Sequence, residues 1–141
     1  MERTHDTFAV LACGTPGWFS ISARLLPLGL LAQFLSAGIT LFRDSGMWAP
    51  HGAVGGALSL PVIALVGGAL LDRRLNGFGW WAGLTALLYL TQVALAAGAG
   101  PWLALHPLNG ALLLSASLIL LAEVERRLGT TGLDPSPPKR K

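Results

Sequence analysis

Charged side chains are scarce in this sequence. Only 12% of its 141 residues are Asp, Glu, Lys or Arg, and 52% are hydrophobic, whereas soluble domains carry about 25% charged residues. Between Leu75 and Ala122 the only side chain that can be charged at neutral pH is His106. Water-facing helices would interrupt so long a stretch with Lys or Glu. The composition therefore excludes an ordinary soluble domain and predicts lipid as the solvent.

Cysteine and clustered basic charge are also nearly absent. Cys13 is the only cysteine, which excludes an intramolecular disulfide and any zinc or iron-sulfur site built on several cysteines. The net charge is +3, and the basic residues flank apolar segments instead of forming a patch, so nucleic-acid binding is not indicated. The sequence also lacks a recognisable nucleophile, acid-base pair or phosphate-binding loop, and we expect a protein that is not an enzyme by itself.

Long apolar segments, in contrast, are abundant. A helix needs about 20 mostly apolar residues to cross roughly 30 Å of hydrocarbon. Breaks rich in Gly, Pro and charge divide the chain into four such segments, at residues 22–42, 51–71, 79–97 and 102–122. Because the breaks are short, consecutive helices should be antiparallel neighbours. The sequence predicts an all-α membrane protein with four transmembrane helices in an up-and-down bundle.

The flanking segments suggest an orientation in the bilayer. Nine of the ten Lys and Arg residues fall on one side of the predicted bundle and only Arg43 on the other, and positive loops stay in the cytoplasm. We expect a cytoplasmic N-terminal segment at residues 1–21, the membrane domain at 22–127, and a cytoplasmic tail at 128–141. The tail is rich in proline and ends in three basic residues, which predicts disorder and contact with anionic lipid.

The two halves of the chain resemble one helical hairpin used twice. Each half contains, in order, a glutamine, an Ala-Gly pair, a tryptophan, a histidine and, four residues later, a glycine. These are Gln33, Ala37-Gly38, Trp48, His51 and Gly55, then Gln92, Ala97-Gly98, Trp102, His106 and Gly110. The spacing differs between the halves, and a sequence of so few residue types can repeat by coincidence. Tandem hairpins would place a shared site at their pseudo-symmetry axis.

The histidines are the strongest candidates for a cofactor site. His51 and His106 stand near the external starts of helices two and four, which are diagonal in an up-and-down bundle, so both rings can face the central axis. A haem iron takes one axial nitrogen from each face. Gly55 and Gly110 lie one turn further on, where a porphyrin edge could approach the backbone. The pattern predicts haem b ligated by His51 and His106, although each histidine alone could merely bind water or head groups.

Two glutamines are predicted within the membrane, where polar side chains are costly. Gln33 and Gln92 could contact a buried cofactor, either a ring edge or a quinone carbonyl. Alternatively, they only hydrogen-bond helices together. No acid, lysine or arginine lies deep in a predicted span, which argues against an ion path or a transporter.

The pattern resembles small bacterial four-helix membrane proteins related to the cytochrome b561 class. The resemblance is carried by Gln33 before Ala37-Gly38, by His51, and by the sequence His106-Pro107-Leu108-Asn109-Gly110. It implies b-type haem, electron exchange with a quinol or a redox partner protein, and a place in the bacterial plasma membrane. Proteins of that type with two haems carry a second histidine further along each ligand helix. Here those positions are Ala64 or Leu65 and Ile119 or Leu120, so we expect at most one haem, near the external face.

Two interpretations of function remain open. The first is a single-haem or quinone-contacting redox or accessory protein. The second is a cofactor-free scaffold or assembly subunit, whose polar residues only hold helices together. Both predict the same bundle.

Overall fold

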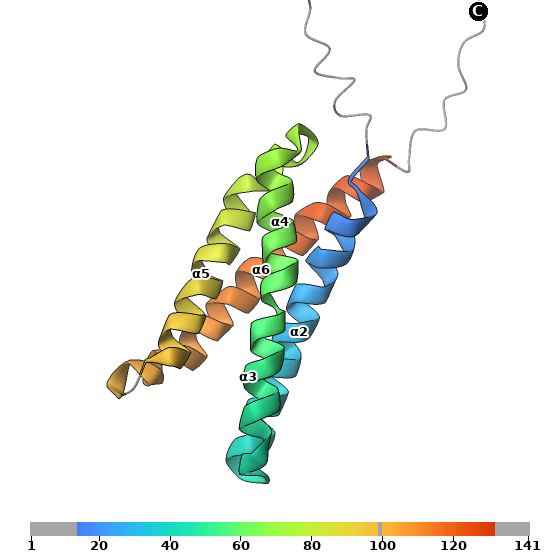
Figure 1. Cartoon of the computed structure of the whole chain (residues 1–141). Helices are drawn as coiled ribbons and strands as arrows, with labels where there is room; N and C mark the ends of the chain where they lie inside the picture. Colours follow the sequence, from blue (N-terminus) through green and yellow to red (C-terminus); the bar gives the residue numbers. More distant parts are fainter. Residues whose placement is uncertain (1–13, 99, 132–141) are drawn as a thin grey trace, which may run out of the picture.

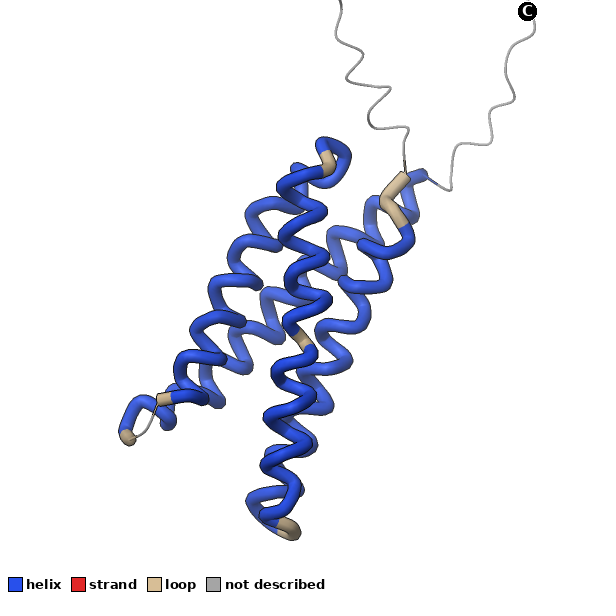
Figure 2. Tube along the Cα trace, in the orientation of Figure 1, coloured by secondary structure: helices blue, strands red, loops and turns tan. Residues whose placement is uncertain are grey.

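The computed structural model describes residues 14–98 and 100–131. The first thirteen residues, with His5 and Cys13, and most of the predicted basic tail lie outside these ranges. Within them the chain is helical and contains no strand. Figure 2 shows long helical rods joined by short turns.

The helices form four apolar spans, as the sequence predicts. The first is α2 (Gly17–Phe42). The second comprises η1 (Ser45–Met47), α3 (Trp48–Ala57) and α4 (Ser59–Leu71), and the third comprises η2 (Arg73–Phe78) and α5 (Gly79–Ala97). The fourth comprises η3 (Pro101–Leu105) and α6 (His106–Thr131). All four are long and apolar enough to cross a membrane, and the prediction of an all-α four-helix bundle is confirmed.

The first helix begins earlier than expected. It starts at Gly17 instead of residue 22, because the carbonyl of Pro16 accepts hydrogen bonds from the backbone N–H groups of Phe19 and Ser20. Proline is well suited to a helix start, where its missing N–H is not needed. The extra turn places the Phe19 ring in the core, where it is fully buried against Phe78.

Each span packs against its two neighbours in a ring. Helix α2 packs on α3, α4 and α6, and α5 packs on α4 and α6. The second and fourth spans are therefore diagonal. Figure 1 shows that the lower ends of α5 and α6 diverge from those of α2 and α3, whereas the upper halves lie closer together.

The second span is interrupted at Leu58, between α3 and α4. Pro61 follows in the next turn, and it has no N–H to donate to the carbonyl of Ala57, against which its ring would also clash. The interruption, visible as a tan segment in Figure 2, separates the half of the span that carries His51 from the half that packs in the apolar core.

The apolar core occupies the half of the bundle nearest the α4–α5 connection. Its fully buried members include Leu26, Leu65, Leu75, Leu120 and Val124. Large apolar side chains also cover the outside, where Leu35 is 66% and Leu70 is 74% exposed. So much outward apolar surface on four spans is suited to lipid, and the chain is a multi-pass membrane protein.

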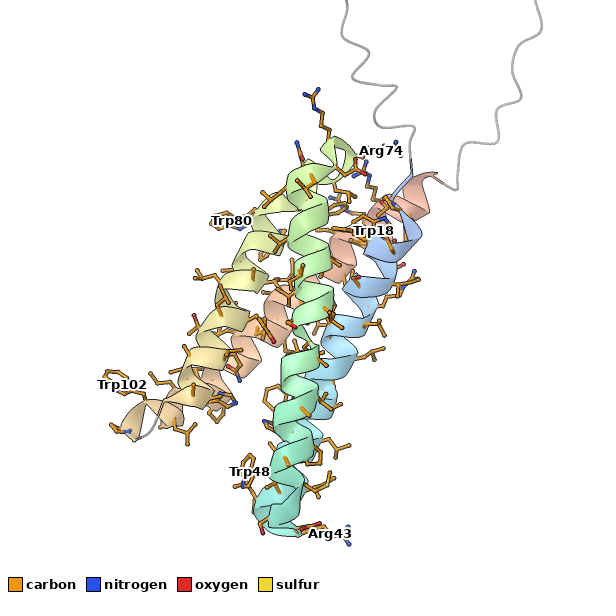
Figure 3. All side chains as sticks on the ribbon, viewed as in Figure 1. Trp18, Arg43, Trp48, Arg74, Trp80 and Trp102 are labelled. Atoms are coloured by element: carbon orange, nitrogen blue, oxygen red, sulfur yellow. The ribbon has the colours of Figure 1, made fainter. Side chains whose placement is uncertain are left out.

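Aromatic and charged side chains distinguish the two ends of the bundle. Figure 3 labels Trp18, Trp80 and Arg74 at one end, and Trp48, Trp102 and Arg43 at the other. We call these the basic end and the histidine end. Tryptophan prefers both membrane interfaces. At the basic end Arg24 pairs with Glu125 at 2.7 Å, and Arg127 donates to the carbonyl of Arg74 at 2.5 Å.

Two adjacent glycines in α4 provide a test of this packing. An added Cβ at Gly68 would lie 2.6 Å from Cη2 of Trp18 and 2.9 Å from Cδ2 of Phe19, whereas one at Gly67 would meet nothing within 4 Å. Gly68→Ala should therefore lower the free energy of unfolding by about 1–3 kcal/mol through overpacking. Gly67→Ala should be neutral or stabilising, because alanine is the better helix former. Unfolding in detergent followed by circular dichroism measures both, and equal stabilities would contradict the packing described.

Candidate functional site

The structure brings His51 and His106 together at the histidine end. His51 lies in the first turns of α3 and His106 is the first residue of α6, so the two come from diagonal spans. Their ring centroids are 6.5 Å apart, with 57° between the ring planes. Two residues far apart in the sequence therefore form one cluster.

The His51 ring is held through its Nδ1 atom. Ser36 Oγ on α2 lies 2.9 Å from Nδ1 and also donates to the carbonyl oxygen of Gln33 at 3.0 Å. A hydroxyl has one proton and a carbonyl can only accept. Both contacts are hydrogen bonds only if Nδ1–H donates to Ser36. The Nε2 atom of His51 then keeps a lone pair that can bind a metal. Trp48 packs edge-on against the ring, with centroids 5.5 Å apart.

The His106 ring is held through its other nitrogen, Nε2. Asn109 Nδ2 donates to the carbonyl of Leu88 at 2.9 Å and to Oε1 of Gln92 at 2.7 Å. These bonds orient the Gln92 amide so that its Nε2, 3.1 Å from Nε2 of His106, can only donate. The proton of His106 therefore sits on Nδ1, which is buried and has no partner. A buried donor without a partner costs about 1–3 kcal/mol.

Both predicted glycines face the glutamine of their own hairpin. An added Cβ at Gly55 would lie 3.4 Å from Oε1 of Gln33, and one at Gly110 would lie 3.1 Å from Nε2 of Gln92 and 3.4 Å from Cζ of Phe34. The matching contacts in the two halves support the tandem-hairpin interpretation. Glutamine side chains, not open space, therefore cover the positions expected to admit a porphyrin edge. The amide nitrogen of Gln33 is buried without a partner.

Tyr89 connects the two hairpins beside the histidines. Its hydroxyl donates to the carbonyl oxygen of Gly55 at 3.0 Å, and the carbonyl of Gly56 lies at 3.3 Å. These glycines precede the interruption at Leu58. The Tyr89 hydroxyl therefore holds α3 against α5.

Sequence reasoning did not assign Ser36 and Asn109 to the site. A signal was present, because Ser36 follows Gln33 by three residues and Asn109 follows His106 by three, which places each pair on one helix face. The packing between helices decides which polar side chain bonds to each histidine nitrogen. Residue spacing along the sequence does not reveal these contacts.

The distance between the two ring centroids is close to that of two imidazoles bound to one haem iron. Two metal–nitrogen bonds of about 2.0 Å, with about 1.1 Å from each nitrogen to its ring centre, place such rings about 6 Å apart. Across residues 14–98 and 100–131 no group of three or more His, Cys, Asp or Glu could hold a metal ion. Two protein ligands suffice for a haem iron, since the porphyrin supplies the other four. The fit requires that Gln92 release Nε2 of His106.

The positions where a second haem would need histidines are apolar. Leu65 and Leu120 are core residues, each 1% exposed. The histidine cluster is thus confined to one end of the bundle.

Comparison with known proteins gives one match. Residues 33–100 match a family of unknown function, DUF6220. The matched range is slightly less than half of the chain and includes Gln33, His51, Gly55 and Gln92, but ends before His106 and Gly110. No curated protein and no solved structure matches the chain.

The hydrogen bond from Tyr89 can be tested by removing one oxygen. Tyr89→Phe should lower the free energy of unfolding by about 0.6–2 kcal/mol, the range for hydrogen bonds between membrane helices. Thr91→Val is the matched control, since the Thr91 hydroxyl bonds only to the Leu87 carbonyl of its own helix. Denaturant titration in detergent measures both variants. Equal stability of Tyr89→Phe and wild type would show that the contact does not hold the hairpins together.

Proposed function

We propose that this membrane protein holds one b-type haem between His51 and His106 and acts as a redox sensor, carrier or accessory subunit. The observation that carries the proposal is the 6.5 Å separation of two ring centroids from diagonal spans. Rings at this separation can bind one metal from opposite sides. The resemblance to small proteins of the cytochrome b561 class supports the same cofactor.

The chain's own residues would prepare the two imidazoles. Ser36 fixes the tautomer of His51 that leaves Nε2 unprotonated. Gln92 holds His106 through Nε2 and would have to release that atom if His106 were to bind the haem iron. When bound, haem b supplies a one-electron couple. Burial and hydrogen bonds to the axial imidazoles would tune its potential.

A single haem near one face suits exchange with a partner on that face. The other half of the bundle is filled by aliphatic side chains such as Leu65 and Leu120. Electron transfer across the whole bilayer would need a second centre there. A quinol or a redox protein that meets the histidine end is therefore the proposed partner.

The second candidate is a cofactor-free scaffold or assembly subunit. One observation favours it, namely that Gln33 and Gln92 already cover Gly55 and Gly110. In this case the chain of bonds from Asn109 through Gln92 to His106 serves only to join helices.

The visible spectrum distinguishes the two candidates. The full chain, purified from haem-supplied cells, should show a Soret band that shifts on reduction. The double variant His51→Ala, His106→Ala should lose it while keeping its helical circular dichroism, because both axial nitrogens are gone. His5→Ala, which alters the remaining histidine, is the matched control and should retain the band. A colourless but folded wild type, or a band that survives the double change, refutes the haem proposal.

We further propose that the basic end faces the cytoplasm of a bacterial plasma membrane, with both chain termini on that side. Figure 3 labels Arg74 at this end and Arg43 at the histidine end; Arg73 neighbours Arg74 in η2, Arg127 donates to Arg74, and Arg24 pairs with Glu125, which precedes Arg126. Positive charge near spans is retained in the cytoplasm during insertion.

Cysteine labelling tests this orientation. In a Cys13→Ala background, Ser45→Cys places a thiol at the histidine end and Asn76→Cys places one at the basic end; both positions are exposed. A membrane-impermeant maleimide should label Ser45→Cys in intact cells and Asn76→Cys only after lysis. The reverse pattern would invert the topology and move the histidines to the cytoplasmic face.

A further inference from the structure

A groove runs along the outer seam between α5 and α6. It has a volume of about 270 Å³ and is lined by Trp81, Leu84 and Leu88 from α5 and by Leu112, Ser115 and Ile119 from α6. The polar groups among these side chains are the indole N–H of Trp81 and the hydroxyl of Ser115, which donates to the carbonyl of Ala111 at 2.9 Å. The rest of the lining is aliphatic, so the groove offers a mainly apolar surface.

The groove opens toward the hydrocarbon of the bilayer. Leu112 is 52% and Ile119 is 41% exposed, and the lining belongs to two apolar spans, Arg73–Ala97 and Pro101–Gly129. From Trp81 to Leu88 the groove extends about 10 Å at about 1.5 Å per residue. One leaflet contributes about 15 Å of hydrocarbon. An extended acyl chain within that leaflet matches the groove in direction, length and polarity.

The inner end of the groove is closed by polar groups. The carbonyl of Leu88 accepts a hydrogen bond from Asn109 at 2.9 Å, and Asn109 precedes Leu112 by three residues on the same face of α6. The apolar lining therefore stops where the hydrogen bonds that hold His106 begin. A tail that enters from the basic end would meet that network at Leu88.

The outer end carries the ion pair of Arg126 with Glu123. Glu123 and Arg126 continue the face of Ile119, four and seven residues further along α6. Arg126 uses Nε and Nη2 to bind Glu123, which leaves Nη1 outside that ion pair. The indole of Trp81 is at the same end of the groove, and tryptophan prefers the head-group region.

From these observations we infer that a phospholipid with an anionic head group binds at this seam, in the leaflet on the side of the basic end. Its acyl chain fills the groove between Trp81 and Leu88, and its phosphate meets Arg126. At this end of the bundle five arginines (Arg24, Arg73, Arg74, Arg126 and Arg127) outnumber the three acids Asp72, Glu123 and Glu125, and the excess positive charge favours an anionic head group over a zwitterionic one. This site is separate from the histidine cluster and does not depend on haem.

Native mass spectrometry of the full chain in detergent tests the site. Phosphatidylglycerol should be retained in a one-to-one complex better than phosphatidylcholine with the same acyl chains. Ser115→Leu fills the groove from an exposed position and should reduce retention of both lipids about tenfold. Ala32→Leu, an exposed small residue of α2, is the matched control and should bind as wild type does.

The head-group contact is tested at Arg126. Arg126→Gln should reduce the preference for phosphatidylglycerol about fivefold, as expected for one basic residue near an anionic lipid. Arg43→Gln, at the histidine end, should leave the preference unchanged. Equal retention of the two lipids by wild type, or unchanged retention in a folded Ser115→Leu, overturns the proposal. A protein dimer that Ser115→Leu abolishes and that is insensitive to lipid would assign the groove to a second copy instead.

Discussion

A polar group inside hydrocarbon must find its partner within the protein, and this requirement organises the whole bundle. The backbone meets it by forming helices throughout the four spans. Where the second span is interrupted at Leu58, the carbonyls of Gly55 and Gly56 receive the hydroxyl of Tyr89 from another helix. The same rule brings Ser36 and Gln92 against the two histidines and Asn109 against Gln92, because in lipid these side chains have no water to bond to.

The helices are consequently held together by different interactions in the two halves of the bundle. Near the basic end, apolar side chains such as Leu65 and Leu120 are fully packed, and Gly68 lets the Trp18 and Phe19 rings approach α4 closely. Near the histidine end the hairpins diverge and are connected by hydrogen bonds and by the facing imidazoles (Figure 1). Hydrogen bonds can be exchanged for bonds to a ligand more readily than a packed core can be rearranged. Stability and the candidate site are thus separated along the membrane normal.

The two hairpins contribute matching contacts to the histidine cluster, but they hold their histidines through different ring nitrogens. In both hairpins a glutamine covers the glycine that follows the histidine. His51, however, is held through Nδ1 and keeps its Nε2 lone pair, whereas His106 is held through Nε2 and leaves a buried Nδ1–H without a partner. Gln33 Nε2 is unpartnered as well. In the described part of the chain the polar network beside the two histidines therefore leaves these two nitrogen atoms without a hydrogen-bond partner.

The sequence by itself determined the solvent, the helix class and the number of spans. The reason is that apolar length and the Gly, Pro and charge between segments are local properties. It also identified both histidines, because a diagonal pairing follows from connectivity alone. It placed the start of the first helix at residue 22 and missed the turn from Gly17, which the hydrogen bonds to the carbonyl of Pro16 add. Only the tertiary structure decided which nitrogen each histidine presents, where Tyr89 donates, and that a groove opens between α5 and α6. These depend on side chains packed across helices, and their distances are fixed only once all four spans are assembled.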